Sequence, residues 1–155
     1  MAESVNVIDV GFVPEAAVSG AVLLQSEYST YLIFNAIKLD ADTGRYEDVG
    51  LAVCEFVDCM ITKFGYPNEE AWHSIPRTKG LSYDVCEVAN SEWSREIATL
   101  NRHAFPDTPE LNQRHFLIMF HDSSFECLAN ELRAELTTEP LTTILARLSE
   151  RIAAE

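Results

Sequence analysis

The sequence is poor in basic residues. Its 155 residues include 11 lysines and arginines against 25 aspartates and glutamates, which gives a net charge of −14 at neutral pH. Proteins that bind nucleic acid phosphates or anionic membranes gain affinity from cationic side chains, so we expect neither kind of partner. The acidic residues are scattered, as on an ordinary soluble surface, and a basic protein is the partner that this charge favours.

Long apolar runs are also missing. No stretch approaches the roughly 18 uncharged apolar residues that span a bilayer. The opening Met-Ala-Glu-Ser-Val lacks the basic start and apolar run of a secretory signal, so we expect a bacterial, cytoplasmic protein. The four cysteines form no Cys-x-x-Cys pair, and their spacing predicts buried, reduced thiols rather than disulfides.

The motifs of known catalytic and cofactor sites are absent as well. The chain has no Gly-x-Ser-x-Gly, no Walker A loop and no Gly-x-Gly-x-x-Gly. Its four histidines follow neither the His-Glu-x-x-His spacing nor that of a zinc finger. The sequence therefore predicts no cofactor and no metal, and it favours a protein without enzymatic activity.

What the chain does contain is enough apolar material for one packed domain. Its residues are 47% hydrophobic, with only six glycines and six prolines, and its length suits a single domain over 1–155. Strand patterns dominate the first two thirds, and helices enter late without regular alternation. This order predicts the α+β class: a mainly antiparallel sheet, with room for strong curvature, covered by two or three helices. The clearest strand patterns lie at 5–13, 21–39, 49–56, 59–64, 83–88 and 116–127.

Turn and cap residues predict several boundaries. Asp40–Gly44 is the clearest turn. Asn68 is expected to cap a short helix, and Asn90 or Ser91 a second one. The residues at 141–152 place their apolar side chains on one face of a third helix, which must lie on an apolar surface. This helix or an open sheet edge would form the contact of a homodimer, which the sequence favours over a monomer.

The richest chemical cluster is Phe120–Cys127, which places an imidazole, two carboxylates, two hydroxyls and a thiol at one predicted hairpin tip. If Ser123–Ser124 form a two-residue turn, His121 faces Glu126 across the antiparallel ladder. A carboxylate so placed orients an imidazole and raises its basicity, as in general-base sites. The candidate catalytic residues are therefore His121, Asp122 and Glu126.

Two neighbours complete this tip as candidate binding residues. Ser123 offers a hydroxyl and Cys127 a supporting thiol. The same segment also fits a purely structural turn, in which Asp122 and Ser123 make local hydrogen bonds. The pair of His121 and Glu126 would then be an ordinary cross-strand contact. Both interpretations stay open, and the structural one is favoured.

A second candidate segment is 64–73, where Gly and Pro fix a sharp turn from strand to helix and three aromatic side chains crowd it. Aromatic residues beside a rigid turn can line a pocket or anchor a partner. They also commonly plug the end of a sheet, which is the alternative here. The candidate binding residues of this segment are Tyr66, Asn68, Trp72 and His73.

The two segments together resemble a family of small, stand-alone bacterial proteins of unknown function, found among accessory or mobile genes. The similarity rests on Phe-Gly-Tyr-Pro-Asn-Glu-Glu-Ala at 64–71 and Phe-His-Asp-Ser-Ser-Phe-Glu-Cys at 120–127. It extends over about 45–130. Relatives carry Gly-His where this chain has Ser and Ile at 74–75, which weakens a histidine-based site near His73. The resemblance implies no particular activity.

Three functions follow as hypotheses. The leading one is a non-enzymatic, acidic binding protein that acts through a basic protein partner, as an antagonist or immunity-like protein. The first alternative is a small hydrolase or metal-dependent enzyme built on His121, Asp122 and Glu126. The second is an oligomeric carrier of a small molecule, with its pocket near Tyr66 and Trp72.

Overall fold

The computed structural model describes residues 1–16 and 20–155, which form ten strands and three helices. The helices are α1 (Glu69–His73), α2 (Glu92–Ala104) and α3 (Leu141–Ala153). The strands are β1 (Ser4–Val7), β2 (Val13–Pro14), β3 (Val22–Gln25), β4 (Thr30–Leu39), β5 (Tyr46–Val57), β6 (Ile61–Gly65), β7 (Val85–Ala89), β8 (Arg114–Met119), β9 (Ser124–Ala129) and β10 (Glu131–Thr137).

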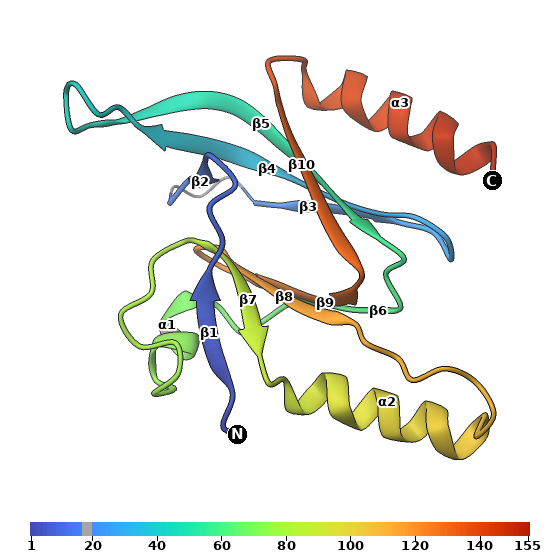
Figure 1. The fold of residues 1–155 in the computed structure, drawn as a ribbon. Coiled ribbons are helices and arrows are strands. Elements are labelled where there is room, and N and C mark those ends of the chain that lie inside the picture. The colour runs from blue at the N-terminus through green and yellow to red at the C-terminus, as the bar shows by residue number, and fades with distance from the viewer. Residues whose placement is uncertain (17–19) are drawn as a thin grey trace.

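The strands form two antiparallel sheets that face each other (Figure 1). Sheet A has the order β1-β7-β8-β9-β6. Sheet B has the order β10-β5-β4-β2, and β3 also pairs with β4. The predicted α+β class with mainly antiparallel strands is therefore confirmed, and the strands divide between two layers rather than one curved sheet.

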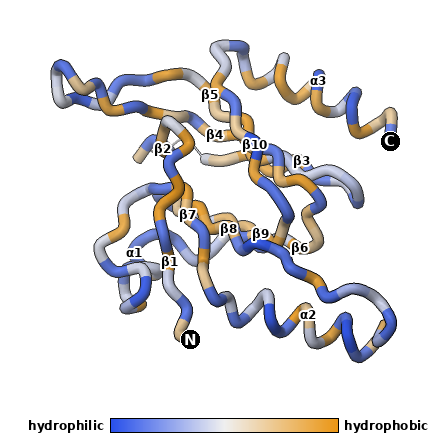
Figure 2. The backbone as a smooth tube through the Cα atoms, viewed as in Figure 1, coloured by the Kyte–Doolittle hydropathy of each residue, from blue (hydrophilic) through white to orange (hydrophobic). Residues whose placement is uncertain are grey.

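The main core lies between the two sheets. Successive side chains of a strand point to opposite faces, so Leu32 and Phe34 of β4 point inward while Ile33 points outward. Phe56 of sheet B lies against Phe125 of sheet A, with ring centroids 4.9 Å apart. Each such buried aromatic ring contributes about 1.5–3 kcal/mol to the free energy of unfolding. Figure 2 shows hydrophobic residues along the strands that line this interface.

Helix α3 covers the outer face of sheet B, as the apolar pattern at 141–152 predicts. Ile144 and Leu148 are fully buried there against Tyr31, Ile33 and Val53. Hydrophobic and hydrophilic residues alternate along this helix (Figure 2). Its apolar face is therefore occupied within the chain, so the open sheet edges are the better surfaces for a contact between two copies.

The outer face of sheet A is covered differently. Trp72 of α1 packs on Cys86, Val88, Leu117 and Met119. Helix α2 leads away from the end of β7 (Figure 1), and in the described structure none of its residues is fully buried. A cleft remains between the beginning of α2 and the segment around α1.

Some predicted elements need correction. The segment 5–13 divides into β1 and β2, which belong to different sheets. The expected strand near 59–64 exists as β6, but it pairs with β9 instead of returning along β5. Strand β10 has no counterpart among the predictions, because its charged residues Glu131, Arg133 and Glu135 alternate with others in a sequence that is largely exposed at the edge of sheet B. Polar edge strands lack the apolar alternation by which strands are recognised.

The predicted turn and caps are confirmed. Asp40 accepts a hydrogen bond from the Asp42 N–H at 2.9 Å within the turn. Asn68 caps α1, and of the two candidates at 90 and 91 the residue that caps α2 is Ser91. No helix in the described residues is long and apolar enough to cross a membrane.

Gly50 is the position where the close packing of β5 and β10 requires a glycine. Its φ is +93°, and an added Cβ would overlap the Thr137 carbonyl oxygen. Gly44 also has a positive φ, +67°, but a Cβ there meets no atom within 4 Å. Substitutions at the two glycines can therefore be compared to separate the cost of backbone strain from the cost of steric overlap.

We predict that Gly50→Ala lowers the free energy of unfolding by about 3 kcal/mol, because it adds an overlap with backbone to the cost of a positive φ. Gly44→Ala is the matched control and should cost roughly 1 kcal/mol, from φ alone. Urea unfolding of both variants measures the difference. Equal losses would show that β10 does not lie so close to β5.

Candidate functional site

The hairpin tip between β8 and β9 differs from its predicted form. The Phe120 N–H donates to the Ser123 carbonyl at 2.8 Å, so His121 and Asp122 are the two loop residues. Ser124 instead belongs to β9, where its Oγ accepts a hydrogen bond from the Trp72 indole N–H at 2.9 Å. That partner lets a serine lie buried in the strand, and the turn falls two residues earlier than predicted.

The predicted contact between His121 and Glu126 is consequently wrong, because the register sets Glu126 opposite Leu117. His121 Nδ1 lies 2.9 Å from Asp122 Oδ1 in an exposed pair. The hydrogen bond and charge of Asp122 raise the pKa of His121. A catalytic role for His121 and Asp122 stays a prediction, but without Glu126 beside them.

Glu126 instead belongs to a buried chain of hydrogen bonds on the outer face of sheet A. Its Oε1 lies 2.9 Å from His115 Nε2, and His115 Nδ1 lies 2.8 Å from Ser91 Oγ. All three residues are less than 9% exposed. Ser91 Oγ also accepts the Ser94 N–H at 3.0 Å, which caps α2. An ionised Glu126 can only accept, so His115 Nε2 donates and His115 Nδ1 accepts the Ser91 hydroxyl proton.

Sequence reasoning missed the role of His115 and Ser91. His115 was one of four histidines without a motif, and Ser91 was predicted only as a helix cap. The chain forms because β8 and β9 pair, which sets His115 diagonally across from Glu126 on one face. No spacing in the sequence could have shown this.

A cleft of about 330 Å³ opens beside His115 and Glu126. Both tryptophans of the chain line it, Trp72 from α1 and Trp93 from the first turn of α2. The Trp93 and His115 rings meet edge to face, with centroids 5.1 Å apart. The described residues lining the cleft are Glu3, Lys63, Trp72, Arg77, Glu92, Trp93, Glu96, His115 and Glu126.

Basic side chains of the chain itself already lie over both indoles. Lys63 Nζ lies 3.8 Å from the centroid of the Trp93 ring, and the Arg77 guanidinium carbon lies 5.8 Å from that of Trp72. Such positions gain from the negative face of an aromatic ring. Arg77 also pairs with Glu3. Two basic side chains of the chain itself therefore already lie against the indoles of the cleft.

The predicted binding residues fall into separate places. Trp72 lines the cleft, whereas Tyr66 is exposed away from it and Asn68 serves as the α1 cap. Ser123 closes the β8–β9 turn through its carbonyl. Cys127 is fully buried in the core between the sheets, and its role as a supporting thiol stays a prediction.

His73, the remaining predicted binding residue, lies in the last turn of α1. Its Nε2 is buried without a hydrogen-bond partner in the described part of the chain. An imidazole nitrogen buried in this way costs about 1–3 kcal/mol relative to a bonded one. A binding role for His73 stays a prediction.

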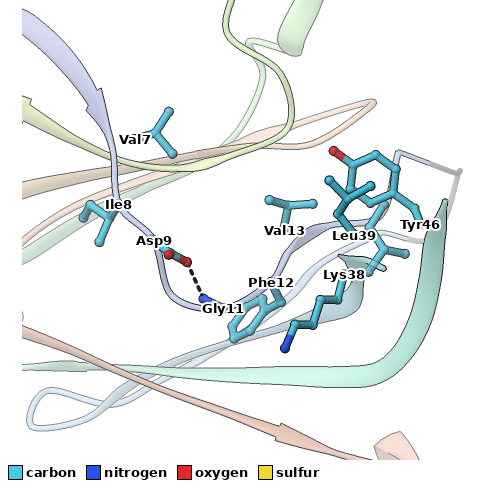
Figure 3. Close-up of a pocket in the computed structure, with 10 residues that line it drawn as sticks. Val7, Ile8, Asp9, Gly11, Phe12, Val13, Lys38, Leu39 and Tyr46 are labelled. Atoms are coloured by element: carbon cyan, nitrogen blue, oxygen red, sulfur yellow. Dashed lines mark hydrogen bonds between the residues drawn. The ribbon is translucent and has the colours of Figure 1, made fainter. Parts of the chain in front are cut away.

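A second hollow of about 450 Å³ lies on the other side of the molecule, between the β1–β2 connection and the outer ends of β4 and β5. Figure 3 shows Val13, Leu39 and Tyr46 along it, and Asp9, which accepts the Gly11 N–H at 2.9 Å. Its lining is mainly apolar, and it brings together neither a nucleophile nor a chain of titratable groups. It is a weaker candidate than the cleft.

Burial separates the four cysteines. Cys54, Cys86 and Cys127 are buried, as predicted, while Cys59 is half-buried. A hydrogen bond from the Cys127 thiol lowers the pKa of Cys59 to about 7. Burial raises the pKa of Cys54 and that of Cys86 to about 12. The thiolate is the reactive form of cysteine, so Cys59 should differ sharply from the others.

We predict that iodoacetamide at pH 8 alkylates Cys59 well before the other three cysteines of the folded protein. The rate should fall about tenfold for each pH unit below 7, because the reactive thiolate is then protonated. Peptide mass spectrometry of timed samples measures this, and Cys59→Ser is the control. Comparable early alkylation of Cys54 or Cys86 would contradict the assignment.

Among the described residues, no group of three or more His, Cys, Asp or Glu side chains could hold a metal ion. Comparisons with known family models, with curated proteins and with solved structures found no match. The resemblance of the segments at 64–71 and 120–127 to small bacterial proteins therefore stays a prediction. What remains for a functional assignment is the cleft, with its indoles and carboxylates, and the hydrogen-bonded chain behind it.

Proposed function

We propose that this chain is a binding protein that receives a basic side chain of a protein partner in the cleft between α2 and the outer face of sheet A. The observation that carries the proposal is the lining of that cleft: two indoles together with Glu3, Glu92, Glu96 and Glu126. Aromatic faces and carboxylates together are a usual site for guanidinium and ammonium groups.

The balance of charge in the cleft supports this direction. Lys63 and Arg77 are the basic residues among the described ones that line it, against four carboxylates. Arg77 is already paired with Glu3. Glu92 and Glu96 lie one turn apart on an exposed face of α2. Among the described residues, the basic side chain that pairs with either of them is Arg95, which approaches Glu92 only to 4.0 Å. A further cation is therefore attracted to the rim.

Lys63 covers the surface of Trp93 on which a basic side chain of the partner would bind. It is exposed on β6, an edge strand, and its ammonium lies on the Trp93 face. A basic residue of a partner can take over that face while Lys63 swings into solvent. Arginine fits better than lysine, since its planar guanidinium stacks on the ring and also binds carboxylates in a bidentate manner.

A protein partner is favoured over a free small molecule because the charge extends beyond the cleft. The whole chain carries a net charge of −14, which speeds encounter with a basic surface at low salt. This suits an antagonist that covers the basic site of a toxin or nuclease in the bacterial cytoplasm. A homodimer through an open sheet edge is compatible with it, because the cleft lies on a sheet face.

We predict that Glu92→Gln combined with Glu96→Gln weakens binding of a nine-residue arginine peptide roughly tenfold, through loss of two rim charges. Both tryptophans line the cleft, so their fluorescence reports the titration. The matched control, Glu47→Gln with Glu150→Gln, removes two exposed charges elsewhere and should have a much smaller effect. Equal losses in the two pairs would mean general charge attraction and would contradict the proposal.

We also predict that Lys63→Ala tightens binding of the same peptide, whereas Trp93→Ala weakens it. Removing Lys63 frees the indole face and leaves four carboxylates against one basic residue in the cleft. Removing Trp93 takes away the face itself. Tighter binding in Lys63→Ala by about threefold to tenfold is expected from one cation–π contact of roughly 0.5–1 kcal/mol plus one charge. Unchanged binding in both variants would place the peptide elsewhere.

A further inference from the structure

We infer that Ser91 is the nucleophile of an acyl-transfer site that acts on small esters, with His115 as its base. The inference goes beyond the proposed binding function and does not depend on it. It rests on the hydrogen-bonded chain of Ser91, His115 and Glu126 and on a cavity of about 360 Å³ that Ser91 and His115 line. Ser91 lines that cavity and not the cleft.

The backbone around Ser91 places its hydroxyl at a sharp junction. Strand β7 ends at Ala89, Asn90 takes a positive φ of +55°, and α2 begins at Glu92. A serine at a tight turn from strand to helix is also how α/β-hydrolases present their nucleophile. A positive φ costs free energy outside glycine, although asparagine tolerates it better than most residues.

The hydrogen bonds leave the Ser91 oxygen free to react. It accepts one bond, from the Ser94 N–H, and donates its proton to His115 Nδ1. One lone pair remains. Glu126 holds the opposite nitrogen of the ring at 2.9 Å, which fixes the tautomer and compensates the charge of an imidazolium. Glu126 is a positioning residue, because it acts through His115.

The cavity offers groups for a substrate. Arg95, Asn112 and Gln113 line it together with Ser91 and His115. Gln113 Oε1 is buried and has no hydrogen-bond partner in the described residues, although its Nε2 donates to Asn130. A buried acceptor without a partner is costly, and only a donor, such as a hydroxyl or amide N–H on the acyl or alcohol part of the ester, can satisfy it. A cavity of this volume accommodates a small ester.

The reaction balances with water as the second reactant. Ser91 Oγ attacks the ester carbonyl carbon while its proton passes to His115 Nδ1. The bond from that carbon to the alcohol oxygen then breaks, and the departing oxygen takes the proton from Nδ1, which leaves an acyl-serine. Water attacks the acyl carbon, gives one proton to Nδ1, and the Ser91 oxygen leaves and recovers that proton. The products are a carboxylic acid and an alcohol.

The test is labelling of the intact protein with a fluorophosphonate, which loses fluoride when a serine oxygen attacks its phosphorus. We expect one label, at Ser91, found by intact mass and peptide mapping. Ser91→Ala should not label, but it also removes the α2 cap. Ser91→Asn keeps a capping side chain and lacks the hydroxyl, so it should fold, with an unchanged circular dichroism spectrum, and should not label. No labelling of the wild type, or labelling that persists in Ser91→Asn, would overturn the inference.

Two further variants test the assignment. Ser123→Ala, at the hairpin tip, should label as the wild type does, and loss of label there would move the nucleophile to the tip and overturn the assignment. With p-nitrophenyl acetate, Glu126→Gln should lower kcat about a hundredfold with little change in KM, and an unchanged kcat would overturn its positioning role.

Discussion

The arrangement of the outer surface depends on one constraint: β9 is buried along its whole length, yet carries Ser124 and Glu126. A buried polar group without a partner costs about 1–3 kcal/mol, and more when charged. Ser124 is satisfied by the Trp72 indole, and Glu126 by His115, which is held by Ser91. These bonds fix where α1 packs and where α2 begins.

The same bonds create both proposed sites. Because Ser124 holds Trp72 and because Ser91 starts α2, the two tryptophans come to line one cleft with Glu92 and Glu126. His115 lines both that cleft and the cavity that Ser91 lines. Binding of a basic group on one side and attack on an ester on the other are therefore separable functions. A charge that binds close to Glu126 would nevertheless change the electrostatic environment of His115, and this would link the two proposed functions.

Local rules predicted much of the fold. The Asp40 turn, the Asn68 cap, the strand at 49–56 and the face of α3 each follow from side-chain chemistry within a few residues, and the structure has them. The hairpin turn was misplaced because Ser123 and Ser124 read as loop residues. The hydrogen bond from Trp72, 52 residues away in sequence, makes Ser124 a strand residue instead.

The sequence by itself determined the class of fold, the acidic character and which faces of the helices and strands are apolar, because periodicity and net charge are properties of neighbouring residues or of simple sums. Only the tertiary structure decided which polar groups meet. Glu126 pairs with His115 rather than His121 because strand register, set by the whole core, chooses among partners that look equivalent along the chain. Side chains from 63, 72, 93 and 126 reach one cleft only after two helices and two strands have packed.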